Sequence, residues 1–158
     1  MKHLFCWVVY ILLFPIILFA NPKLLIDFNE VFKSLYFGEK VRVIIDYSKC
    51  KFVSDTNKEF GPNAIGGMNI DNFEYFAKES MKNELAYISS SQTVLIFHPR
   101  YGYVLNYIKL KIFENNSITI IARYLHPISF EVKMDETFTG YFSTDNNDKN
   151  GIRFYKIE

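Results

Sequence analysis

The sequence has 158 residues and a formal net charge of +1, with 18 lysines and arginines against 17 aspartates and glutamates. This length corresponds to about one domain, and the near-neutral balance argues against nucleic acid as a general partner. Aromatic residues make up 18% of the chain, which favours a β-rich fold because phenylalanine and tyrosine suit pleated, half-buried surfaces.

The first 20 residues predict a signal peptide. A short polar start precedes the almost entirely apolar run from Leu4 to Phe19, and Ala20 supplies the small residue expected before a cleavage point. The run is shorter than the roughly 20 apolar residues that span a bilayer. We therefore expect export to the periplasm or the medium, no membrane attachment after cleavage, and a single β-rich domain over residues 21–158. An uncleaved membrane anchor is the alternative.

The segment from Pro22 to Phe37 predicts an N-terminal amphipathic helix. Apolar residues recur there at helical spacing, Pro22 fits a first helical turn, and Gly38 fits a C-terminal stop. We expect this helix to pack on the rest of the domain through its apolar stripe.

The remainder predicts an antiparallel meander of about seven strands. The predicted strands are Val41–Tyr47 with an extension over Lys51–Ser54, Ile70–Met81, Leu85–Phe97, Tyr103–Glu114, Ser117–Leu125, Phe130–Met134, Thr137–Phe142 and Ile152–Ile157. Residues 70–81 also fit helical spacing, and their aromatic density favours a strand. Such a sheet must close or cover its edges. The predicted fold class is therefore mainly β (α+β), a curled sheet or small barrel with the helix against its open side.

The turn near Asn115 predicts how two strands pair. A three-residue loop, residues 115–117, would place Ile112 opposite Ile120 and Lys109 opposite Arg123, which keeps apolar side chains on one face. One face of the hairpin is then core, and the other carries basic side chains.

Five segments together resemble a family of exported bacterial proteins. They are VRVIIDYSKCK, AIGGMNIDNFEYFAK, HPRYGYVLNYIKLKI, ITIIARYL and FEVKMDETF, which extend from Val41 to Thr137. The stretch is similar to the VirK family, whose name comes from an association with virulence regions. The resemblance implies an exported protein that acts at a host or envelope interface. It implies no activity, cofactor or catalytic residue.

The predicted turn His98–Tyr103 is the first candidate for a binding surface. His98, Arg100, Tyr101 and Tyr103 combine a titratable ring, a guanidinium and two phenols. Arginine and tyrosine anchor many interfaces, and loops on rigid sheets often carry function. The alternative is ordinary turn chemistry, in which proline and glycine set the bend and the aromatic rings stabilise it.

A second candidate is the basic group of Lys109, Lys111 and Arg123 on the outer face of the predicted hairpin. A compact basic patch can hold a carboxylate, a phosphate or an acidic glycan. Alternating lysines on a solvated sheet face that resist aggregation are the competing interpretation.

Cys50 is the one cysteine after residue 20, and it admits three interpretations. As a nucleophile with His98 or His126 as base it would make the protein a thiol-dependent hydrolase. As a lone thiol in an oxidising compartment it would form a Cys50-linked dimer. As a buried apolar side chain it would only pack. The last is favoured, because no catalytic signature surrounds it.

The histidines and cysteines have no structural-metal spacing, and no motif implies a cofactor. The preferred hypothesis is a non-enzymatic binding protein, for an unknown partner protein or a small-molecule ligand inside the curled sheet. Asn106 is the polar residue expected on the inner, apolar face that holds Ile108.

Overall fold

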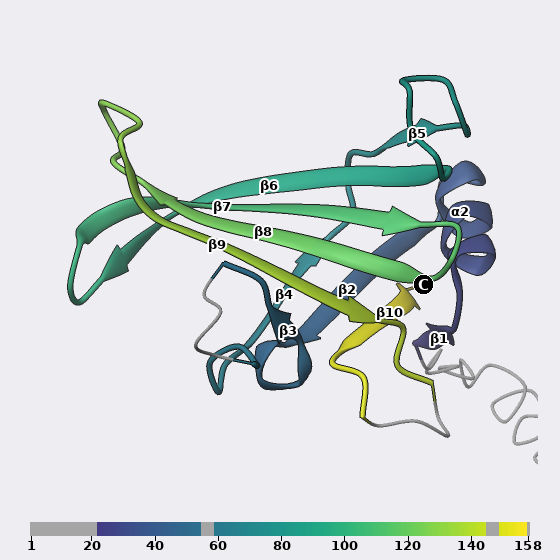
Figure 1. Ribbon diagram of the computed structural model, residues 1–158, viewed down its shortest axis with the longest axis horizontal. Helices are drawn as coiled ribbons and strands as arrows, with labels where there is room; N and C mark the ends of the chain where they lie inside the picture. Colours follow the sequence, from purple (N-terminus) through teal and green to yellow (C-terminus); the bar gives the residue numbers. More distant parts are fainter. Residues whose placement is uncertain (1–21, 55–58, 145–148, 158) are drawn as a thin grey trace, which may run out of the picture.

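In the described part of the chain, two antiparallel β-sheets pack face to face, with one α-helix at one end (Figure 1). The computed structural model describes residues 22–54, 59–144 and 149–157. The predicted signal peptide, residues 1–20, lies outside them. The predicted mainly β class is confirmed, but the closed barrel is wrong. Sheet closure is unnecessary here because the apolar faces of two separate sheets cover each other.

Sheet A contains four strands. In spatial order they are β1 (Lys23–Leu25), β10 (Ile152–Ile157), β2 (Lys40–Asp46) and β4 (Ile65–Asn69). The predicted strand at Val41 is β2, whose Val41, Val43 and Ile45 are buried by simple alternation. Sheet A therefore joins strands from both ends of the described chain.

Sheet B contains six strands. In spatial order they are β3 (Lys51–Phe52), β9 (Val132–Tyr141), β8 (Ser117–Leu125), β7 (Gly102–Phe113), β6 (Tyr87–His98) and β5 (Glu74–Phe76). The four central strands are long and run well past sheet A on the left of Figure 1. That overhang leaves part of the inner face of sheet B without a covering sheet.

The helix is shorter than its sequence pattern predicts. Helix α2 covers Phe28–Tyr36 and begins at Asp27, whose side chain accepts a hydrogen bond from the Glu30 backbone N–H. Residues 23–25 form β1 instead, because they pair with β10. Gly38 adopts a positive φ of 74° just past the helix, which confirms the predicted stop.

Four strand predictions need correction. Residues 51–52 do not extend β2, because a 3-10 turn at Tyr47–Lys49 redirects the chain into sheet B. Strand β4 was not predicted, because it includes Gly66 and Gly67, and glycine has a weak strand propensity. Only Glu74–Phe76 of the predicted strand at 70–81 pairs with a neighbour. The two strands predicted between residues 130 and 142 are one, β9.

The β7–β8 hairpin has the predicted faces but a different register. Its loop has three residues, 114–116, and Ile112 lies opposite Ile118 rather than Ile120. Lys109 faces Ile121, not Arg123. A shift of the loop by one residue moves the pairing by two, so the buried and solvated faces are preserved while the partners change.

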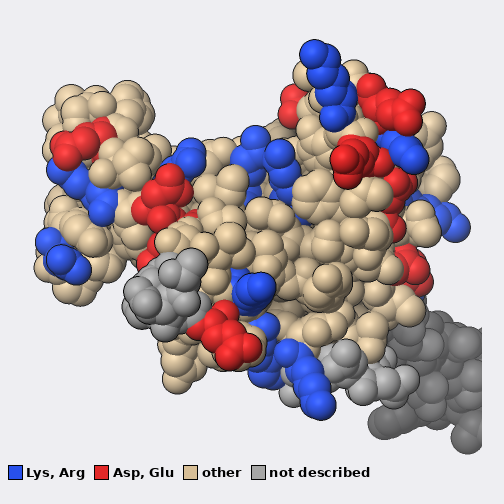
Figure 2. Space-filling view, in the orientation of Figure 1, with Lys and Arg blue, Asp and Glu red and all other residues tan. Residues whose placement is uncertain are grey.

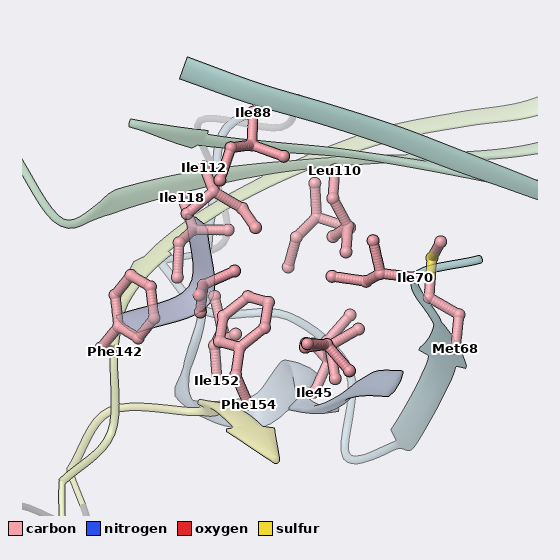
Figure 3. Packing of buried hydrophobic residues seen from close by; sticks show 14 of the residues in the cluster. Ile45, Met68, Ile70, Ile88, Leu110, Ile112, Ile118, Phe142, Ile152 and Phe154 are labelled. Carbon is pink, nitrogen blue, oxygen red and sulfur yellow. The ribbon is translucent and has the colours of Figure 1, made fainter. Parts of the chain in front are cut away.

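The hydrophobic core lies between the two sheets. Ile88, Leu110, Ile112 and Ile118 of sheet B face Ile45, Ile152 and Phe154 of sheet A (Figure 3). These seven side chains are almost completely buried. Each fully buried side chain of this kind contributes roughly 1.5–3 kcal/mol.

Candidate functional site

A cleft opens where sheet B continues beyond the core. It has a volume of about 240 Å³, and we call it the inter-sheet cleft. Residues of β7, β8 and β9 form one wall, and residues near β2 and β4 form the other. The lining residues are Asn106, Ile108, Ala122, Tyr124, Met134, Glu136 and Phe138 on the first wall, and Tyr47, Pro62, Ala64, Ile65 and Gly66 on the second.

Strand pairing sets two rows of side chains across the sheet B wall. One row runs from Asn106 to Tyr124 to Met134, and the next runs from Ile108 to Ala122 to Glu136. Directly paired residues of an antiparallel sheet point to the same face. The wall is therefore apolar apart from an amide, a phenol and a carboxylate, and the sequence-based expectation that Asn106 lies beside Ile108 on the inner face is confirmed.

Asn106 and Glu136 are two cleft residues whose amide and carboxylate have no partner among the residues that the structure describes. Both residues are half-buried. Among the described residues, no hydrogen bond or ion pair satisfies the Asn106 amide or the Glu136 carboxylate. Partly removing such groups from water costs free energy unless a ligand or water pairs with them. The amide of Asn106 and the carboxylate of Glu136 are thus available to a ligand in the cleft.

Tyr47 forms the opposite wall, directly after β2. Its ring meets Phe138 edge-on, with ring centroids 4.9 Å apart. Burial, and in smaller measure the charges of Cys50, Tyr124 and Glu136, raise the pKa of the Tyr47 phenol to about 12. Tyr47, Tyr124 and Glu136 all line this one cavity.

Tyr124 also connects the cleft to the predicted turn at His98. The His98 ring lies 4.9 Å from Tyr101 and 5.0 Å from Tyr124, centroid to centroid. We call these three residues the ring cluster. Two of them come from the turn, so the structure brings that sequence candidate to one end of the inter-sheet cleft.

The other two turn residues point elsewhere. Arg100 is exposed, with its guanidinium carbon 5.4 Å from the centre of the Tyr101 ring. Tyr103 lies on the outer face of sheet B, is 65% exposed, and contacts Phe97. The turn therefore divides its side chains between the two faces of the sheet.

The predicted basic group lies on the outer face, opposite the cleft, and its three side chains have different surroundings. Arg123 donates a hydrogen bond to Asp135 at 3.0 Å, and this contact raises the pKa of the guanidinium. The Lys111 ammonium lies 5.2 Å from the centre of the Tyr87 ring. Lys109 lines a separate polar hollow with Ser91. Figure 2 shows acidic and basic side chains intermingled over the visible face.

Cys50 has the properties of a packing residue. Its side chain is fully buried and donates a hydrogen bond to the Asp46 carbonyl at 3.4 Å. Burial, and then the charge of Asp46, raise the pKa of the thiol to about 11. A reactive cysteine needs the reverse, a lowered pKa and access to solvent. This geometry lends no support to the hydrolase or to the Cys50-linked dimer.

Comparisons with known proteins place the chain in a family. The model of the VirK family, described as VirK protein, matches residues 24–130. The chain belongs to the VirK family. A crystal structure of lpg1832, a VirK family protein from Legionella pneumophila, has a similar fold with a TM-score of 0.62. The match covers 83% of this chain and 97% of that protein at 13% sequence identity. No curated protein matches the sequence.

Two further findings concern membranes and metals. In the part of the chain that the structure describes, none of the helices has the length and apolar character needed to cross a bilayer. The same residues contain no group of three or more histidine, cysteine, aspartate or glutamate side chains suited to a metal ion.

Sequence reasoning missed the second wall of the cleft. Tyr47 and Ile65 belong to segments predicted as a strand end and a connection. The Gly66–Gly67 pair was the available signal, because glycines within a strand often mark a close approach to another group. A side chain at Gly66 would meet the Tyr47 ring at 3.1 Å, so the glycine allows Tyr47 to lie over β4.

Proposed function

We propose that this VirK family member is a non-enzymatic binding protein that acts after export and takes a small ligand in the inter-sheet cleft. The observation that carries the proposal is the pair of unpartnered polar groups, on Asn106 and Glu136, in an otherwise apolar cleft. Sites for small molecules characteristically combine an apolar lining with a few convergent polar groups. The volume of about 240 Å³ suits a compact ligand or a single side chain.

Native mass spectrometry of the exported protein tests the ligand. We expect extra mass in the native spectrum that disappears on denaturation, or, for protein purified without ligand, small-molecule fragments that shift the NMR signals of cleft residues. Ala122→Leu fills the cleft floor and should abolish either signal. Thr119→Leu, on the outer face of the same strand, should preserve it. A bare native mass together with fragments that never perturb the cleft would overturn the proposal.

The same samples test export. Cells that produce the chain with its own N-terminus should release or hold in the periplasm a protein whose denatured mass corresponds to a start at Asn21. Recovery of the full-length chain in the cytosol would contradict this part of the proposal.

A partner protein is the second candidate function, and one observation favours it. Leu95, Phe97, Tyr103 and Val132 are each at least half exposed and lie at the overhanging end of sheet B; we call them the distal patch. Contiguous exposed apolar surface of this kind marks many interaction sites. Exposed Arg100 at the adjacent turn suits a partner that presents a carboxylate beside an apolar surface.

Site-specific crosslinking discriminates this candidate. A photoreactive side chain at Phe97 should crosslink one defined partner in exporting cells, and Tyr103→Ser should reduce the yield. The same group placed at Thr119 serves as the control. Crosslinks of equal yield at both positions, or none at Phe97, would exclude the distal patch as a specific surface.

A further inference from the structure

The inter-sheet cleft has a charge preference that follows from its lining. Glu136 is the only charged residue among the described residues that line it. Its carboxylate comes from the inner face of β9, between Met134 and Phe138 in the alternation of that strand. None of the lysines, arginines or histidines described contributes to this lining. Within this lining the Glu136 carboxylate therefore has no opposite charge beside it.

Aromatic rings flank this carboxylate. Tyr47 lies on one wall and Tyr124 on the other. Contact with Phe138 fixes the first ring, and contact with His98, 5.0 Å away, fixes the second. The faces of aromatic rings carry negative electrostatic potential, so they attract cations. Rings that are already held in place lose little conformational entropy when a ligand binds. Met134 adds a polarisable thioether to the same wall.

From these features we infer that the inter-sheet cleft binds an organic cation, an ammonium or guanidinium group carrying apolar substituents. The carboxylate of Glu136 supplies the charge pair, the two tyrosine rings supply cation–π contacts, and the apolar floor accepts methyl or methylene groups. This inference rests on the proposed function and specifies the chemical class of its ligand. Asn106 contributes an amide that can accept or donate a hydrogen bond at the cleft's end.

The cation has two possible sources with the same chemistry. It can be a free or headgroup cation such as choline, or the side chain of a lysine or arginine on a partner. Choline has a neutral isostere, 3,3-dimethyl-1-butanol, in which carbon replaces nitrogen. This pair of probes varies charge at nearly constant shape.

The test is an NMR titration of the purified protein with both probes, followed through the Asn106 side-chain amide and the Ala122 backbone amide. We expect choline to bind saturably and the neutral isostere to bind at least about tenfold more weakly, a difference of about 1.4 kcal/mol. Glu136→Gln should weaken choline binding by a similar factor and leave the isostere unchanged. Glu114→Gln, on the exposed β7–β8 turn, is the matched control and should change neither.

The outcomes separate this inference from the proposed function. Equal binding of both probes, or unchanged choline binding in Glu136→Gln, would overturn the cation while leaving a cleft that binds neutral molecules. If no cation perturbs the NMR signals of the cleft, the inferred cation site is overturned as well, and the native mass experiment then decides the proposed function independently.

Capped lysine and capped arginine identify the source of the cation. Tighter binding than choline assigns the cleft to a partner's side chain, and weaker binding assigns it to a free or headgroup cation. A Tyr124→Phe variant, which keeps the ring, should retain choline binding, whereas Tyr124→Leu should lose it.

Discussion

The side chain of Asn116 accepts a hydrogen bond from the backbone N–H of Phe28, with 2.9 Å between the two atoms and 88 residues between them in sequence. Phe28 is the first residue of α2, where backbone N–H groups have no partner within the helix. Asn116 has a positive φ of 65° in the β7–β8 turn. One residue therefore shapes a hairpin of sheet B and attaches the helix to it.

Substitutions at Asn116 can separate these two roles. Asn116→Gly keeps the left-handed backbone favourable but loses the hydrogen bond, and should lower the free energy of unfolding by about 1 kcal/mol. Asn116→Ala adds backbone strain and should cost about 2 kcal/mol. Urea denaturation measures both. Equal losses in the two variants would show that the backbone conformation contributes nothing.

The buried thiol of Cys50 should be unreactive in the folded protein. In the chain that begins at Asn21, Cys50 is the one cysteine, so its reaction with a thiol reagent is simple to follow. We expect negligible reaction at pH 8 in buffer and one rapid equivalent in denaturant, because burial both blocks access and raises the pKa to about 11. Rapid modification of the native protein would contradict the buried geometry and revive the nucleophile.

The same pKa shift predicts a loss of stability at alkaline pH. An unfolded thiol titrates near pH 8.5, whereas the folded one titrates near 11. The folded state thus holds the Cys50 proton more tightly than the unfolded state does. The resulting contribution to the free energy of unfolding is fully present below about pH 8.5 and is lost as the pH rises toward 11. The loss should be on the order of 3 kcal/mol. Cys50→Ala should flatten this part of the stability profile, while Tyr47, whose pKa is also raised, sustains a further decline above pH 10.

Two phenylalanines should respond very differently to truncation. Phe154 is fully buried between the sheets, and Phe154→Ala should cost roughly 3–5 kcal/mol because it leaves a cavity. Phe97 is 67% exposed in the distal patch, and Phe97→Ala should change the free energy of unfolding by less than about 0.5 kcal/mol. Thermal and urea unfolding of both variants provide the comparison. A large decrease in the free energy of unfolding for Phe97→Ala would mean that the distal patch is covered in the folded protein.

Glu136→Gln should leave the ligand-free protein as stable as the original or more stable by a few tenths of a kcal/mol. The reason is that its carboxylate is half-buried without an ion-pair partner among the described residues. A matched change, Asp135→Asn, removes the partner of Arg123 and should cost up to about 1 kcal/mol. Melting curves recorded without ligand check the contrast. A larger loss for Glu136→Gln than for Asp135→Asn would indicate a structural role for Glu136.

The long strands of sheet B were predictable because alternation and turn residues act locally. Leu110 and Ile120 alternate with polar neighbours, and the turn at Asn115 separates them clearly. The division into two sheets was not predictable, since the short turn after β2 is decided by tertiary pairing of Lys51 with Thr139. Strand β1 was missed for the same reason, because its three residues acquire their conformation by pairing with β10.

Two parts of the candidate site were predictable from the sequence. Side chains alternate along a strand, so Asn106 shares the inner face with Ile108, and the turn at His98 is indicated by its residue types. The sequence does not point to Glu136, because it falls in the gap between the strands predicted over Phe130–Met134 and Thr137–Phe142, and adjacent Asp135 and Glu136 point to opposite faces of an extended chain. Glu136 points to the inner face because the two predicted strands are one continuous strand, β9, in which Glu136 and Phe138 lie two residues apart on the same side. Local sequence does not contain that information.

The position of β10 in sheet A has a consequence for how the chain is made. β10 lies between β1 and β2 and pairs with both, so β1 has no strand neighbour until residues 152–157 have been synthesised, whereas β2 can pair with β4 earlier. The four strands of sheet A therefore cannot join into one sheet until β10 is present. Under the export proposed above, sheet A would still lack its central strand while the earlier part of the chain crosses the membrane.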